Sequence, residues 1–103
     1  MGFVQYHETA SDLPEETRAF ARIIASMAEE ADAINSYEQR IAVEKNPAAQ
    51  AIMGNAQQEE FKHFGMELEF LLRAKPKWRE ILQGILFQSG DVVELGERAE
   101  KRS

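Results

Sequence analysis

The sequence predicts an all-α protein built on an antiparallel hairpin of two long helices, with short helices at the C-terminal end. Two long stretches carry apolar side chains at spacings of three and four residues, which is the periodicity of one helix face. The three prolines stand where predicted helices begin or end, and no alternating pattern typical of a strand occurs. We expect a single domain over residues 1–103, with its ordered helical part at about 13–99.

The first predicted helix begins at Pro14 and ends near Val43. A proline in the first turn, acidic side chains at Glu15–Glu16 and a capping candidate in Ser11–Asp12 are typical of a helix start. No Gly or Pro interrupts the stretch that follows. Its inward stripe consists of Phe20, Ile23, Met27, Glu30, Ile34, Tyr37 and Ile41.

The second predicted helix runs from about Pro47 to Ala74. Asn46 is a favourable N-cap and Pro47 a favourable first helical residue. This helix carries two apolar faces, so it must pack on more than one neighbour, which favours oligomerisation. One face consists of Met53, Ala56, Glu60, His63, Glu67 and Phe70, and the other of Phe61, Phe64, Leu68, Leu71 and Leu72.

Two short helices are predicted after the hairpin. Lys75–Lys77, which includes Pro76, ends the second helix, and apolar residues from Trp78 to Leu86 indicate a third one. Ser89–Asp91 ends that helix. Asp91 is a capping candidate for a last helix that extends to about Ala99.

Composition excludes several classes of function. The net charge of −6 and the pI of about 4.9 argue against a nucleic-acid partner, which needs a basic surface. The chain has no cysteine, so disulfides, thiolate catalysis and cysteine-based zinc sites are excluded. No apolar run reaches membrane-spanning length, and we expect no membrane partner. An acidic surface concentrates cations near it, although solubility alone also explains the charge.

The segment Glu60-Phe61-Lys62-His63 places a carboxylate and an imidazole on one helix face. Helices joined by a short loop are usually antiparallel neighbours. Because the break is centred near residue 45, residues whose numbers sum to about 90 lie level, which pairs Glu30 with Glu60. Glu30 also lies on the apolar stripe, where a charge must be paired or bind a metal. Glu30, Glu60 and His63 are therefore predicted metal ligands.

These three residues form half of a larger ligand set. Di-iron sites in ferritin-like four-helix bundles take a Glu from each of two helices and a Glu-x-x-His from each of the other two. A two-fold homodimer would supply both halves. Carboxylate and imidazole donors suit iron or manganese and tolerate zinc. The alternative is a metal-free, Glu-rich helix on which Glu60 and His63 are simply exposed.

Neighbouring residues have two interpretations each. Tyr37 lies seven residues after Glu30, about 10 Å along the helix, and is either a donor or redox-active ring at the site or a packed aromatic. Glu29 and Asp32 either attract incoming cations or are ordinary solvated acids. Glu67 follows His63 by four residues and either binds metal or the second imidazole nitrogen, or is exposed. His7 either caps the terminus or binds metal weakly.

The sequence resembles the encapsulated ferritins. The similarity is carried by residues 27–40 and 55–63, by residues 66–73 and by Leu86-Phe87, and it covers roughly residues 13–93. It implies a two-helix protomer that dimerises into a ferritin-like four-helix bundle, and a ring that is a pentamer of dimers. It also implies oxidation of Fe(II) to Fe(III) with oxygen, inside a cytoplasmic encapsulin nanocompartment where the iron mineral collects.

Site roles follow from the resemblance position by position. Glu30, Glu60 and His63 match the ferroxidase ligands of a di-iron site shared between two chains, and Tyr37 matches the site tyrosine. Glu29 and Asp32 match the acids of an outer site through which metal enters. Calcium, manganese or zinc are expected to substitute for iron or to occupy outer acidic sites. Ser36 stands where family members often have Trp, at a contact between subunits.

The sequence therefore leads us to expect a ferroxidase, a non-haem di-iron oxidoreductase that supports iron storage. One alternative is another di-metal helical enzyme of the rubrerythrin type, which needs the same ligands. The other is a helical interaction module without a catalytic metal, held together by its apolar stripes.

Overall fold

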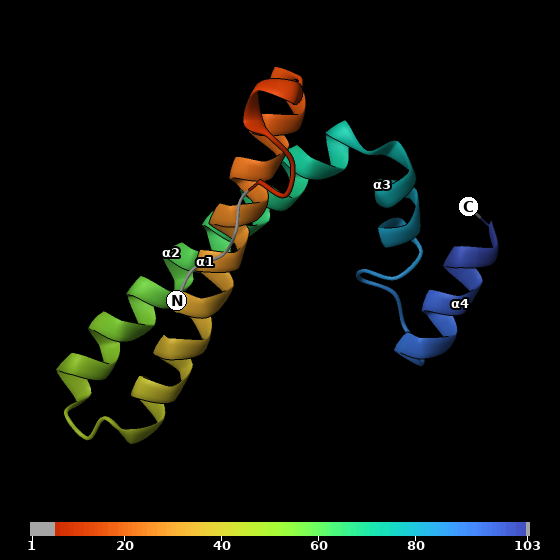
Figure 1. The fold of residues 1–103 in the computed structure, drawn as a ribbon. Helices are drawn as coiled ribbons and strands as arrows, with labels where there is room; N and C mark the ends of the chain where they lie inside the picture. The colour runs from red at the N-terminus through yellow and green to blue at the C-terminus, as the bar shows by residue number, and fades with distance from the viewer. Residues whose placement is uncertain (1–5, 103) are drawn as a thin grey trace. The chain divides into compact units, whose positions relative to one another are not determined.

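The computed structural model describes residues 6–102, and every element in that range is helical (Figure 1). The all-α prediction is therefore confirmed. Residues 1–5 and 103 of the predicted domain lie outside the described residues. The elements are the 3-10 helix η1 (Ala10–Asp12) and the α-helices α1 (Glu15–Val43), α2 (Pro47–Ala74), α3 (Pro76–Gln83) and α4 (Val92–Arg102).

The chain divides into two compact units, one ending at Glu69 and the other beginning at Phe70. Helix α2 contributes to both units. The assignment of residues 1–103 to one domain stays a prediction. None of the helices within residues 6–102 is long and apolar enough to cross a membrane.

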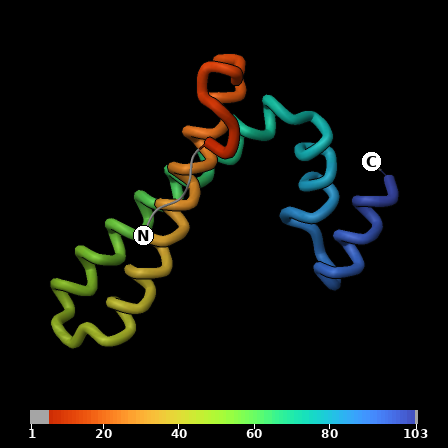
Figure 2. Tube along the Cα trace, in the orientation of Figure 1, coloured from red at the N-terminus to blue at the C-terminus, as the bar shows by residue number. Residues whose placement is uncertain are grey.

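The first unit is an antiparallel hairpin in which α1 and α2 run side by side (Figure 2). Gln57 on α2 fixes the register, because its Nε2 atom donates to the carbonyl oxygen of Ile34 at 3.2 Å and to Oε1 of Glu38 at 3.0 Å. Gln57 is only 8% exposed and is the one buried polar residue of the described chain. Residues 34 and 57 thus lie level, which is the register that the sequence predicts.

The turn between the long helices is closed by side chains. Oδ1 of Asn46 accepts hydrogen bonds from the backbone amides of Ala48 at 2.9 Å and Ala49 at 3.1 Å. These bonds satisfy amides that have no partner inside the helix. The Gln50 side chain donates to the carbonyl of Glu44 at 2.7 Å and so ties α2 back to the end of α1. The predicted cap at Asn46 is confirmed.

The start of α1 differs from the prediction. Ser11 and Asp12 do not cap it, because both belong to η1, and the N-cap position is Pro14 without a side-chain hydrogen bond. The residue before a proline is driven towards extended backbone. Leu13 accordingly has φ −98° and ψ 132°. This extended residue separates η1 from α1, which begins at Glu15.

The second unit contains the end of α2 together with α3 and α4. Helices α3 and α4 contact each other, and a side-chain carbon placed on Gly84 would lie only 2.8 Å from Cβ of Ala99. Glycine at position 84 therefore permits their close approach. The buried residues of this unit are Leu71, Leu72, Leu95 and Ala99.

The connection between α3 and α4 also differs in part from the prediction. Helix α3 ends at Gln83 rather than near Leu86, since the chain turns at Gly84. Phe87 follows with φ 61° and a fully exposed side chain. Helix α4 begins where predicted, because Oδ1 of Asp91 accepts hydrogen bonds from the amides of residues 93 and 94 at 2.9 and 3.0 Å.

Candidate metal centre

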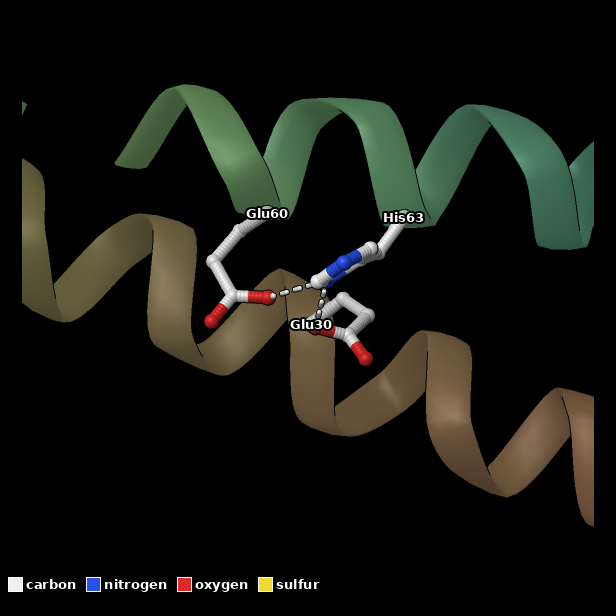
Figure 3. A group of neighbouring side chains, drawn as sticks. All are labelled: Glu30, Glu60 and His63. Atoms are coloured by element: carbon white, nitrogen blue, oxygen red, sulfur yellow. Dashed lines mark hydrogen bonds and ion pairs between the residues drawn. The ribbon is translucent and has the colours of Figure 1, made fainter. Parts of the chain in front are cut away.

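Three side chains converge between α1 and α2 (Figure 3). Glu30 comes from α1, and Glu60 and His63 come from α2, and one ligand atom from each lies within 4.8 Å of the other two. Nδ1 of His63 is 3.3 Å from Oε1 of Glu60 and 3.9 Å from Oε2 of Glu30. Within residues 6–102 this is the one group of three or more His, Asp or Glu side chains close enough to share a metal ion.

Local structure explains the convergence. Glu60 and His63 are three residues apart on α2 and so lie on the same helix face. The register held by Gln57 brings Glu30 opposite them. Gln57 was not predicted as a residue of the site, although it lies three residues before Glu60 on that same face. An amide side chain in line with the predicted ligands is the signal that could have indicated it.

The three side chains are only partly shielded from solvent. The exposed fractions are 19% for Glu30, 23% for Glu60 and 43% for His63. Three donors from one chain do not fill the coordination shell of a transition-metal ion, which takes at least four ligands. Further ligands are therefore needed to complete a metal site here.

The two carboxyl groups shift each other's pKa in opposite directions. A hydrogen bond with Glu60 is the largest cause that raises the pKa of Glu30, to about 7, followed by burial and by the negative charges of Glu60 and Glu67. The same hydrogen bond, together with one to His63, lowers the pKa of Glu60. Two carboxylates this close oppose simultaneous ionisation. A bound cation would remove that repulsion.

The other predicted site residues lie outside the three-residue group. Tyr37 is half-buried, and the guanidinium carbon of Arg40 lies 5.6 Å from the centre of its ring. Glu29 and Asp32 are exposed on α1, and His7 is exposed near η1. Roles for these residues at a metal site stay predictions.

Glu67 is half-buried, so the interpretation of it as an exposed acid is wrong. Its Oε1 atom is shielded from solvent and has no hydrogen-bond partner among the described residues. Burial is the largest cause that raises the pKa of this carboxyl group, and the nearby charges of Glu60 and Glu29 raise it further, whereas His63 lowers it.

The donor set fits a transition-metal ion. Carboxylate oxygens and an imidazole nitrogen are ligands that iron, manganese and zinc accept. One ligand atom from each of the three side chains lies within 4.8 Å of the other two, as expected of groups that converge on a cation. Glu30, Glu60 and His63 are thus the residues that could hold the metal.

Comparison with known proteins identifies relatives of this chain. Residues 5–89 match the family described as EncFtn-like. The chain is 37% identical to the "Ferritin-like protein" of Thermotoga maritima, over 90% of this chain and 82% of that protein. It is 38% identical to the "Encapsulated ferritin-like protein" of Rhodospirillum rubrum, over 84% of this chain and 62% of that protein.

A solved structure shares the fold. The crystal structure of protein ne0167 from Nitrosomonas europaea superimposes with a TM-score of 0.81 and 32% sequence identity. The match covers 86% of this chain and 99% of that one. Together with the family match over most of the sequence, these similarities establish that the chain belongs to the encapsulated ferritin (EncFtn-like) family.

Proposed function

We propose that the protein is a ferroxidase that oxidises Fe(II) to Fe(III) at a di-iron site formed between two subunits. The observation that carries the proposal is the convergence of Glu30, Glu60 and His63 in a member of an iron-handling family. Iron supplies the redox chemistry, since each Fe(II) loses one electron and oxygen accepts it. The protein supplies the ligands and compensates the charge of the metal ions.

Each side chain has a defined task in this proposal. Glu30, whose pKa is about 7, gives up its proton on binding, and both Glu30 and Glu60 bind the cations as carboxylates. His63 binds through a neutral ring nitrogen, which the adjacent carboxylates keep directed into the site. Glu29 and Asp32, exposed on α1, attract cations towards the site.

A homodimer completes the site. One chain offers two carboxylates and one imidazole, and a two-fold partner doubles this set to the composition of a di-iron four-helix bundle. Large apolar side chains on α2 support association, because Phe61 is 51% and Met66 58% exposed. We further propose that dimers form the ring of five dimers, and that an encapsulin shell encloses the ring.

The enclosure in a cytoplasmic nanocompartment rests on the family and on the name of the relative from Rhodospirillum rubrum. The chain spans 62% of the length of that relative, so its partner and its location are proposals for this chain. Co-expression with the encapsulin of the same organism tests this part. Recovery of the protein inside purified shells is expected, and its recovery only outside them would contradict enclosure.

Ferroxidase activity is tested by mixing the metal-free protein with Fe(II) in air and following the ferric product by stopped-flow absorbance. Changing Glu60 or His63 to Ala is expected to lower the initial rate strongly. Glu59→Ala is the matched control, since Glu59 is exposed and paired with Lys62 at 2.8 Å. Rates that are equal in wild type and in both site variants would contradict the proposal.

A metal-free interaction module is the competing function. The exposed apolar side chains of α2 suit such a module as well as they suit a dimer. Metal analysis after purification separates the two functions. About one iron per chain is expected of a site with two irons shared by two chains, and no specific metal would favour the module.

A further inference from the structure

Glu67 holds a carboxylate oxygen for which the described chain supplies no partner. The residue lies one helical turn after His63, on the same face of α2. Its Oε1 atom is shielded from solvent and neither donates nor accepts a hydrogen bond among the described residues. Buried polar atoms are almost always hydrogen-bonded, so this exception requires an explanation.

The charges around Glu67 indicate what kind of partner is missing. Glu60 and Glu29 disfavour its ionised form, and His63 is the one nearby group that favours it. In turn, the negative charge of Glu67 raises the pKa of Glu30. No Lys or Arg of the described residues is among the groups that shift the pKa of Glu67. A divalent cation would compensate this negative surplus, whereas a further anion or an apolar ligand would not.

We propose that Glu67 is a further carboxylate ligand for the divalent metal ion bound by Glu30, Glu60 and His63. The spacing of four residues from His63 lets both side chains approach one ion from the same helix face. This inference rests on the metal-binding part of the proposed function. It adds a third carboxylate from each chain to the donor set.

Removal of the Glu67 charge should have opposite effects on stability and on metal binding. A carboxylate oxygen that is shielded from solvent and has no hydrogen-bond partner destabilises the metal-free fold. Glu67→Gln removes the charge, and Glu67→Met removes both oxygens at similar length. Both variants are expected to keep or raise the melting temperature of the metal-free protein and to lower its affinity for metal.

Isothermal titration of the full chain with Zn(II) tests this, because Zn(II) takes the same donors and has no redox chemistry. Glu67→Gln is expected to weaken binding about 10-fold or more, as loss of a supporting group at a metal site does. Glu16→Gln is the matched control, since it removes one negative charge from an exposed position on α1. It is expected to bind as wild type does.

His63→Ala separates the two levels of the proposal. If His63→Ala abolishes binding while both Glu67 variants bind as wild type does, Glu67 is no ligand and only this inference fails. If wild type itself binds no Zn(II) specifically, the metal site fails as well. If both Glu67 variants lower the melting temperature of the metal-free protein, Glu67 is a structural residue and the inference is overturned.

Discussion

Metal binding at the candidate centre should release a proton from Glu30. The hydrogen bond with Glu60, burial and nearby negative charge raise the pKa of Glu30 to about 7. A carboxyl group must lose its proton to bind a metal ion. Protons and metal ions therefore compete for Glu30 in the pH range around neutrality, and its replacement by Gln removes this competition.

The magnitude follows from the pKa. With a value of about 7, Glu30 is about 90% protonated at pH 6 and about 10% protonated at pH 8. Binding should thus release about 0.9 proton from Glu30 at pH 6 and about 0.1 at pH 8. The same competition lowers the apparent affinity about 10-fold at pH 6 relative to pH 8. A carboxyl group with the ordinary value of 4.5 would show almost no change over this range.

The assay is isothermal titration with Zn(II) at pH 6, 7 and 8, each in two buffers with different ionisation enthalpies. The difference between buffers gives the number of protons released. The difference between wild type and Glu30→Gln gives the number of released protons that depend on Glu30. Equal proton release by wild type and Glu30→Gln at pH 6 would refute the reasoning.

Three further predictions concern the stability of the metal-free protein. The folded state binds the Glu30 proton more tightly than the unfolded state, so the stability that this proton contributes is lost as pH rises from 4.5 to about 7. The melting temperature of Glu30→Gln should therefore depend less on pH than that of wild type. An equal pH dependence in the two proteins would contradict this prediction. Asn46→Ala removes the α2 cap and should cost about 1 kcal/mol in urea unfolding, whereas Asn46→Asp should cost little. Gly84→Ala should destabilise by about 1–3 kcal/mol, because its Cβ would meet Ala99 at 2.8 Å, and Ala99→Gly in the same chain should restore stability.

The parts of the fold that depend on local chemistry were predictable from the sequence. Asn46 and Pro47 mark the turn, and the turn sets which residues of the two helices lie level. The same register brings Glu30 to Glu60 and His63, so the core of the candidate site followed from spacing alone. These predictions succeeded because each depends on neighbours in sequence or on one antiparallel pairing.

Features that depend on contacts distant in sequence were not predictable. Helix α3 ends at Gln83 with Gly84 as its C-cap, and the close approach of Gly84 to Ala99 is a contact that helix periodicity does not predict. The hydrogen bonds of Gln57 and the unpartnered oxygen of Glu67 require the positions of side chains from both helices. At the start of α1, the predicted cap at Ser11–Asp12 was wrong, because Pro14 imposes an extended backbone on Leu13 and so separates these residues from the helix.

Two chains are proposed to hold iron between them through Glu30, Glu60 and His63. Crystals of the iron-loaded protein, measured at the iron absorption edge, test this most directly. We expect anomalous peaks within coordination distance of these three side chains, contributed by two subunits. Peaks elsewhere, or iron held by ligands of a single chain, would contradict the shared di-iron site.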